Sequence, residues 1–365
     1  MMKQPLCLFF LLFCVFSSFV GATTSNTWKV PAIYVFGDST VDVGNNNYLT
    51  NSNAKANYPH YGIDFPHSRP TGRFSNGYNQ IDFVAIHMGF RRSPPPYLSL
   101  NDTNNHQILK GLRGVNFASA GSGILDSTGA NIITTTQQLQ YFETLRSKMM
   151  AQPNAEQVAQ RLSQSLFLIS AGGNDAFAFF AANNSPNNSA VLLFYNTLLS
   201  KYDNHIKTLY SLGARRFAVI NVPPIGCVPT SRARNLTGGC INGMNQIAKG
   251  LNDAITALFS KLAVALPGLK YSIGASYDLT LTAISNPRSY GFKEVESACC
   301  GSGKLNAQSY CTPNATYCMN RKQYLFWDLI HPTQQASKIS ASVFYDGPAQ
   351  FVGPITYKQL VYSDN

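Results

Sequence analysis

Three side chains in this sequence have the types and spacing that nucleophilic catalysis requires. Ser39 follows Ile33 to Phe36, an apolar run typical of a buried strand, so we expect its hydroxyl at the carboxyl end of that strand. A serine hydroxyl attacks an electrophile when a base removes its proton and a third group orients the base. Asp328 and His331, in the segment WDLIHPT, supply this pair, because a spacing of three residues can bring a carboxylate and an imidazole to one face of a tight turn.

Each of these residues also has an ordinary interpretation, and the chain holds a competing pair. Ser39 could cap a turn, because Gly-Asp-Ser is favourable turn chemistry, and Asp328 with His331 could be a structural hydrogen-bonded pair. Asp64 and His67, in the segment DFPH, have the same spacing. They lie in a stretch dense in proline and glycine, which favours a rim or a structural turn over a catalytic pair.

The sequence also offers donors for the negative charge that develops on a substrate oxygen during such an attack. The segment ASAGSG, residues 118–123, follows a predicted strand at Gly114–Phe117. The segment AGGND, residues 171–175, follows another at Leu166–Ser170. Glycine lets a backbone amide approach a ligand closely, and Asn174 provides a neutral side-chain donor. The segment GLND, residues 250–253, repeats the Gly-x-Asn-Asp pattern within an amphipathic helix, so we interpret Asn252 as a solvated helix residue.

Short β-branched and aromatic runs alternate with longer amphipathic stretches, a pattern that predicts a mostly parallel sheet with helices on both faces, an α/β/α sandwich. The five predicted strands are Ala32–Phe36, Gly114–Phe117, Leu166–Ser170, Phe217–Asn221 and Leu269–Ile273. The predicted helices include 137–149, 191–212, 241–266 and a last one at Ala336–Phe344, which follows a loop at Tyr290–Asn320. Open sheets bind ligands outside the carboxyl ends of their strands, where Ser39 and both glycine segments are expected.

The first residues predict an exported protein. Residues 1–22 run from a lone Lys3 through an apolar stretch to small residues, the layout of a secretory signal peptide cut near Ala22. The apolar stretch is short for a membrane span, so we expect no stable span. No composition break, internal repeat or long linker divides the remainder, and residues 23–365 are predicted to form one domain.

The cysteines of the predicted mature chain favour disulfides. They are even in number, no histidine lies among them, and paired CxxC units are absent, so zinc is disfavoured. Adjacent Cys299 and Cys300 cannot bond each other without strain. We expect them to pair, in one of two connectivities, with Cys311 and Cys318. The third bridge would join Cys227 and Cys240.

Glycans and charge bear on the partners of the chain. Five Asn-x-Ser/Thr sequons in polar, turn-rich surroundings are predicted glycosylation sites: Asn101, Asn183, Asn187, Asn235 and Asn314.

Charged residues make up only 12% of the chain, and the formal net charge of +11 is spread thinly, with nothing denser than pairs such as Arg91-Arg92. Nucleic acid is therefore disfavoured as a partner, whereas weak adhesion to acidic wall polysaccharides is compatible with the charge.

The chain resembles the plant GDSL-type esterase/lipase family, within the SGNH hydrolase superfamily. The resemblance runs in order along nearly the whole mature chain and rests on seven segments: FGDSTVDVGNNNY, YGIDFPHSRPTGRFSNG, GVNFASAGSGILD, SAGGNDAF, NVPPIGCVPT, ACCGSG and YLFWDLIHPTQQA. One departure is Thr40, where the family name would have leucine, and this change removes no reacting group. The absence of a Gly-x-Ser-x-Gly elbow argues against the common α/β-hydrolase layout.

The resemblance implies the SGNH hydrolase fold, with a flavodoxin-like sheet, and it implies roles for five residues. Ser39 would be the nucleophile, and Asp328 and His331 would complete a catalytic triad. The backbone amides of Ser39 and Gly121 and the side chain of Asn174 would form the oxyanion hole.

We therefore expect a secreted serine ester hydrolase that cleaves small-molecule, lipid or wall esters through an acyl-enzyme on Ser39, with no metal and no cofactor. Gly123 follows close behind Gly121, which is preferred for its distance from Asn116. An acyltransferase would use the same triad with a sugar or hydroxy-acyl acceptor in place of water, and product analysis with a competing alcohol would distinguish it. The other alternative is a catalytically silent wall glycoprotein.

Overall fold

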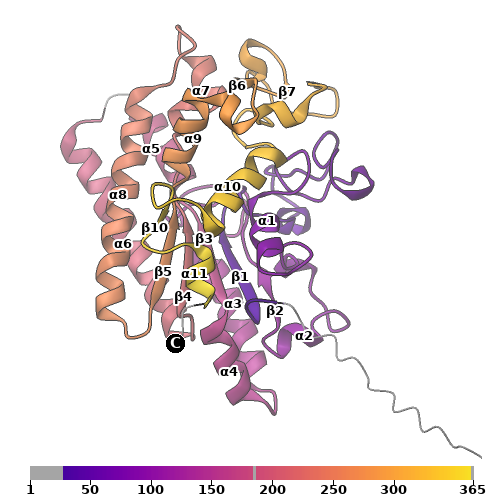
Figure 1. Cartoon of the computed structure of the whole chain (residues 1–365), viewed down its shortest axis with the longest axis vertical. Coiled ribbons are helices and arrows are strands. Elements are labelled where there is room, and N and C mark those ends of the chain that lie inside the picture. The colour runs from indigo at the N-terminus through magenta and orange to yellow at the C-terminus, as the bar shows by residue number, and fades with distance from the viewer. Residues whose placement is uncertain (1–27, 184–185, 363–365) are drawn as a thin grey trace, which may run out of the picture.

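A six-stranded sheet lies at the centre of the fold (Figure 1). The computed structural model describes residues 28–183 and 186–362, so the predicted signal peptide lies outside the described residues. The strands of this sheet are β1 (Ala32–Gly37), β2 (Arg113–Asn116), β3 (Leu166–Ser170), β4 (Arg216–Ile220), β5 (Lys270–Gly274) and β10 (Val352–Gly353). The first five are parallel, and β10 pairs antiparallel with β5.

The order of the strands determines where a site can form. The sheet reads β10-β5-β4-β3-β1-β2, so the chain order reverses between β1 and β3. Parallel strands end at the same edge of a sheet, and the usual ligand site of an open α/β sheet lies at that edge, where the order reverses. Because β1 ends at Gly37, the residues that follow it, Asp38 and Ser39, lie at this point.

Helices cover both faces of the sheet and complete three layers (Figure 1). Strand side chains alternate, so Tyr34 and Phe36 pack on one face and Ile33 and Val35 on the other. The helices that bury the first face are α3 (Thr135–Met150), α4 (Ala155–Gln164), α6 (Asn188–Ser211) and α8 (Asn242–Ala265). Those that bury the second face are α1 (Gln80–His87), α10 (Gln334–Asp346) and α11 (Tyr357–Tyr362). The remaining α-helices are α2 (His106–Leu109), α5 (Gly173–Ala182), α7 (Pro229–Arg234) and α9 (Ser276–Ser285).

The observed layers confirm the predicted fold class. Each of the five predicted strands is present, with ends that differ from the prediction by at most one residue. The sheet differs from the expected five strands by its sixth, β10, which the sequence pattern did not indicate. The predicted helices correspond to α3, α6, α8 and α10, and the other α-helices, each of ten residues or fewer, were not predicted. A helix this short has too few turns to show a clear periodic apolar pattern.

A disulfide-linked segment, residues 290–326, stands apart from the central sheet and is named here the cystine lobe. In place of the plain loop expected at residues 290–320, it contains short strands: β6 (Glu294–Ala298), β7 (Cys300–Gly301), β8 (Thr316–Tyr317) and β9 (Tyr324–Phe326). β6 pairs with β9 and β7 with β8. Of the two expected connectivities, the structure has Cys299–Cys318 and Cys300–Cys311, and the third disulfide is Cys227–Cys240, as predicted.

Candidate active site

Ser39 lies in a tight turn that begins at the last residue of β1, Gly37, where the backbone has room only for glycine. Gly37 has a φ of 137°, and a Cβ at this position would overlap the carbonyl oxygen of Ser170 on the neighbouring strand. The Asp38 amide then donates to that carbonyl oxygen over 3.1 Å, which ends the ladder. The Asp38 carboxylate accepts hydrogen bonds from the amide and the hydroxyl of Thr40, so it closes a tight turn around a half-buried Ser39.

The structure brings Ser39, His331 and Asp328 together in one chain of hydrogen bonds. Nε2 of His331 lies 2.8 Å from Oγ of Ser39, and its Nδ1 lies 2.8 Å from Oδ2 and 2.9 Å from Oδ1 of Asp328. An ionised carboxylate only accepts hydrogen bonds, so Nδ1 carries the proton and Nε2 accepts from the serine hydroxyl. The imidazole is therefore in the tautomer that a general base needs.

The ionised state of Asp328 is supported by its surroundings. Its side chain is 1% exposed, and burial alone would raise its pKa. Electrostatic attraction to His331, together with hydrogen bonds from that residue and from the Ile330 amide, outweighs burial and lowers the pKa of Asp328 below its ordinary value. The carboxylate thus keeps its negative charge beside the imidazole at neutral pH.

Asp328 and His331 come from a turn that follows β9. This strand does not belong to the central sheet, because β9 pairs with β6 in a separate two-stranded sheet. The Trp327 amide donates to the His331 carbonyl over 2.7 Å, which closes the turn. Thr333 then caps α10 through its side chain.

The segments that follow β1, β2 and β3 each contain a group that could donate a hydrogen bond to an oxyanion. Asn174 lies in the first turn of α5, and its Nδ2 donates to the Ser122 carbonyl over 2.9 Å, which leaves the second hydrogen of the amide available. Among the described residues, neither the Ser39 amide nor the Gly121 amide has an acceptor within the chain. The Gly123 amide also lacks one, but a trans peptide points its N–H opposite to the Ser122 carbonyl and so away from Asn174. This geometry favours Gly121.

Two buried side chains that the sequence pattern did not single out hold these loops in place. Gln138 of α3 accepts from the Gly37 amide over 2.9 Å and donates to the Gly37 carbonyl over 3.0 Å. The Asp175 carboxylate accepts from the amides of Ile124 and Leu125, which follow the glycine segment, and burial raises the pKa of Asp175. The signal for Asp175 was its position next to Asn174, whereas Gln138 resembled any polar residue of a helix.

The competing residues are engaged elsewhere. The Asp64 carboxylate forms a two-pronged ion pair with Arg321, at 2.7 and 2.8 Å, and His67 is exposed. No hydrogen bond joins Asp64 to His67 in the described part of the chain. Asn252 is not the solvated residue we expected, because it is 5% exposed and binds both the amide and the carbonyl of Val222, at 2.9 and 2.8 Å.

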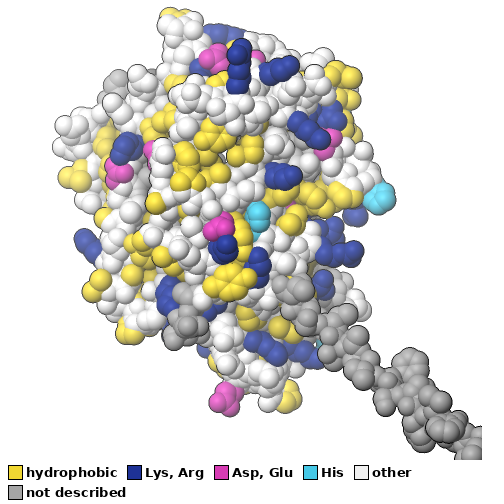
Figure 2. All heavy atoms as spheres, viewed as in Figure 1, with side chains coloured by type: hydrophobic (Ala, Val, Ile, Leu, Met, Phe, Trp, Pro, Cys, Tyr) yellow, Lys and Arg dark blue, Asp and Glu magenta, His cyan; other side chains and the backbone are white. Residues whose placement is uncertain are grey.

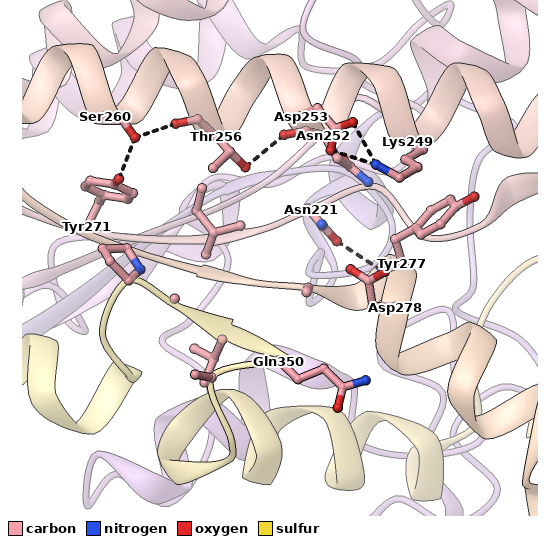
Figure 3. A pocket seen from close by; sticks show the side chains of 16 residues that line it. Asn221, Lys249, Asn252, Asp253, Thr256, Ser260, Tyr271, Tyr277, Asp278 and Gln350 are labelled. Carbon is pink, nitrogen blue, oxygen red and sulfur yellow. Dashed lines mark hydrogen bonds and ion pairs between the residues drawn. The ribbon is translucent and has the colours of Figure 1, made fainter.

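A pocket of about 420 Å³ lies away from the triad, between α8, α9 and β10 (Figure 3). Two pairs of its polar side chains bond to each other. Lys249 and Asp253 form an ion pair of 2.8 Å, and the hydroxyls of Ser260 and Tyr271 lie 3.0 Å apart. No triad residue lines this pocket, so it does not belong to the site at β1.

On the face viewed in Figure 2, Lys and Arg side chains are scattered among apolar and uncharged atoms. No group of three or more His, Cys, Asp or Glu side chains within residues 28–183 and 186–362 could hold a metal ion. In the same ranges, no helix combines the length and the apolar content needed to cross a membrane.

Comparison with known proteins places the chain in a family. A family model described as GDSL-like Lipase/Acylhydrolase matches residues 33–344. GDSL esterase/lipase At5g55050 of Arabidopsis thaliana is 39% identical, with 98% of each chain covered. GDSL esterase/lipase At1g71250 of the same plant is 38% identical, with 91% of this chain and 89% of that protein covered.

One solved structure that matches this chain is distantly similar to it. Phospholipase A1 from Streptomyces albidoflavus NA297 is 15% identical, with 86% of this chain and 97% of that chain covered and a TM-score of 0.35, which is too low to carry an inference. The family match and the two plant relatives, in contrast, span most of the sequence. They show that this chain belongs to the GDSL-like lipase/acylhydrolase family and is a carboxylic ester hydrolase.

Proposed function

We propose that the protein hydrolyses carboxylic esters through an acyl-enzyme on Ser39. The observation that supports this most directly is the 2.8 Å separation between Nε2 of His331 and Oγ of Ser39, with Asp328 bonded to the other ring nitrogen. A serine linked in this way to a base and an orienting carboxylate is the arrangement of a nucleophilic triad.

In the first half of the reaction, Oγ of Ser39 forms a bond to the ester carbonyl carbon while its proton moves to Nε2 of His331. The carbonyl oxygen becomes an oxyanion that accepts hydrogen bonds from the Asn174 side chain and the amides of Ser39 and Gly121. Asp328 stabilises the imidazolium. When the tetrahedral intermediate collapses, the bond to the alkoxy oxygen breaks, and the proton on Nε2 passes to the departing alcohol.

In the second half, water takes the position of the alcohol. His331 removes a proton from this water as its oxygen bonds to the acyl carbon, and the same donors hold the oxyanion. The bond between the acyl carbon and Oγ of Ser39 then breaks. The proton returns from His331 to Oγ, the carboxylic acid is released, and the enzyme is restored without any metal or cofactor.

A serine-directed fluorophosphonate tests the nucleophile. Peptide mapping of the labelled, folded protein should place the phosphonyl group on Ser39, and Ser39→Ala should lower turnover of p-nitrophenyl butyrate by roughly a thousandfold or more. The distant Ser260→Ala variant, whose side chain lines the pocket in Figure 3, serves as a control and should label normally. Stoichiometric labelling of another serine would refute the assignment.

We also propose that the protein is secreted and glycosylated. Three disulfides among the described residues support export to an oxidising compartment. Of the predicted glycan sites, Asn101, Asn187 and Asn314 are exposed, whereas Asn183 and Asn235 are half-buried and donate their side-chain amides to backbone carbonyls. We therefore expect fuller occupancy at the first three.

Protein recovered from the medium of a plant expression host provides the measurement. Its first residue should be close to Thr23, it should contain no free thiol, and glycopeptide mass spectrometry should find glycans chiefly at the three exposed sites. Retention of residues 1–22, or several free cysteines in the secreted material, would contradict export by a cleaved signal peptide.

A further inference from the structure

The carboxylate of Asp328 has a hydrogen-bond donor from outside its own turn. Its Oδ1 accepts from the amides of Ile330 and His331, at 2.9 and 2.8 Å, and both donors lie within three residues of it. Its Oδ2 accepts from the hydroxyl of Tyr61 at 2.8 Å, across a sequence separation of 267 residues. Oδ2 is also one of the two oxygens that face Nδ1 of His331. Tyr61 therefore touches the oxygen that orients the base.

The packing around Tyr61 leaves its hydroxyl little freedom to point elsewhere. The residue is 3% exposed. Its ring packs edge-on against the rings of Tyr58 and Phe74, with centroids 5.4 and 5.6 Å away. Phe74 in turn packs against the imidazole of His331, with centroids 4.8 Å apart. The amide of Gly62, the next residue, donates to the Ser75 carbonyl over 3.0 Å and so anchors the loop.

The hydroxyl also keeps its proton over the range in which an esterase works. Burial and the negative charge of Asp328 raise the pKa of Tyr61 well above its ordinary value. The phenol is therefore a constant donor, and the carboxylate is a constant acceptor. The contact does not switch with pH, so its effect is to orient Asp328 and to share its charge.

We propose that Tyr61 is a positioning residue for the triad, acting through Oδ2 of Asp328. This inference rests on the proposed function. The hydrogen bond from Tyr61 holds the plane of the carboxylate so that it faces Nδ1 of His331. The same hydrogen bond takes up part of the negative charge on Oδ2, so less of that charge is available to stabilise the imidazolium of His331.

Removing this hydroxyl therefore has two consequences of known sign. The carboxylate becomes freer to rotate, so fewer molecules hold the imidazole ready, and kcat should fall roughly tenfold with little change in KM. Without the Tyr61 hydroxyl, Oδ2 of Asp328 keeps more of its negative charge. This charge stabilises the protonated form of the imidazole more strongly than in the wild type. The acid limb of kcat/KM should move to higher pH by roughly half a unit.

The experiment compares Tyr61→Phe, which keeps the ring and its packing, with Tyr58→Phe. Tyr58 packs against the same ring, but its hydroxyl has no hydrogen bond within the described residues, so it is a matched control. Rates on p-nitrophenyl butyrate are measured from about pH 5 to about pH 9. The number of active sites is determined by end-point phosphonate titration. Urea unfolding verifies that each variant is folded. A double-mutant cycle with Asp328→Asn completes the set.

Support would be a lower kcat and a shifted acid limb in Tyr61→Phe, both absent from Tyr58→Phe and both lost when Asp328 is already Asn. The inference is overturned if the pH profiles of Tyr61→Phe and Tyr58→Phe coincide, or if Tyr61→Phe costs as much in the Asp328→Asn background as in the wild type. Its failure is separable from that of the proposed function, because only the latter predicts loss of hydrolysis in Ser39→Ala. Full activity of Ser39→Ala would refute both the proposed function and the inference about Tyr61.

Discussion

Replacing Asn174 or Asn252 by alanine should damage two different properties of the protein. Both residues belong to a Gly-x-Asn-Asp pattern, but the structure gives them different partners. Asn174 is half-buried and has one hydrogen bond, from Nδ2 to the Ser122 carbonyl. Asn252 is buried and satisfies both the amide and the carbonyl of Val222. The first residue is available to a substrate, and the second is fully used by the fold.

These partners determine the expected magnitudes. Asn174→Ala removes one partly exposed hydrogen bond, so the free energy of unfolding should fall by about 1 kcal/mol. It also removes the proposed oxyanion donor, which would act when charge develops, so kcat should fall by roughly a hundredfold with little change in KM. Asn252→Ala leaves two buried backbone groups of Val222 without a partner, at about 1–3 kcal/mol each. It should therefore lower stability by about 2–6 kcal/mol and leave kcat per folded molecule within about threefold.

Urea unfolding and steady-state hydrolysis of p-nitrophenyl butyrate measure the two properties on the same samples. Rates are divided by the number of sites that phosphonate titration detects, so a partly unfolded variant is not mistaken for an inactive one. The assignment is refuted if Asn252→Ala loses kcat while Asn174→Ala keeps it. It is also refuted if Asn174→Ala raises KM without lowering kcat, because that result indicates ground-state binding only.

Two further predictions concern histidines. His331→Ala should lower turnover by roughly a thousandfold or more while the protein stays folded, whereas exposed His67→Ala should cost tenfold at most; the reverse result would exclude the WDLIHPT triad. Burial, with a smaller contribution from Lys201, lowers the pKa of His205 from 6.5 to about 4. Below pH 6.5, His205 binds a proton in the unfolded chain but stays neutral in the folded chain until the pH approaches 4. His205 therefore lowers the free energy of unfolding as the pH falls toward 4, by up to about 3 kcal/mol. Urea unfolding at several pH values should show a shallower acid loss for His205→Gln, and an unchanged slope would contradict this role.

The sequence was sufficient for the parts of the structure that local patterns determine. The long helices each bury an apolar stripe, which is visible as a period of about 3.6 residues. The parallel strands β1, β3 and β4 are buried on both faces, so each is visible as a short, nearly continuous apolar run. The pairing of Asp328 with His331 was also local, because both lie in one turn. The proximity of Ser39 to that turn, 292 residues away, was accessible only through the general location of sites in open sheets and through the family resemblance.

What the sequence did not indicate depends on contacts between distant segments. Asn252 looks like a solvated residue of an amphipathic helix, but tertiary packing turns it toward the backbone of Val222. Gln138 looks like any helical glutamine, yet it binds both polar groups of Gly37. Tyr61 lies in a loop with no periodic pattern, and its partner is 267 residues away. A polar residue that is satisfied by a remote backbone carries no local signature.

The cystine lobe explains how a turn outside the central sheet can hold Asp328 accurately. β9 has only three residues, too few for its own ladder to fix the turn that follows it. The amides of Cys299 and Cys300 extend the contact by donating to the carbonyls of Phe326 and Trp327, at 3.1 and 2.7 Å. Each of these cysteines also forms a disulfide within the lobe, across sequence separations of 19 and 11 residues. Trp327, which precedes Asp328 and is fully buried, packs in one cluster with both cysteines. The carboxylate is therefore oriented from two sides, by the disulfide-linked strand behind it and by the loop that carries Tyr61.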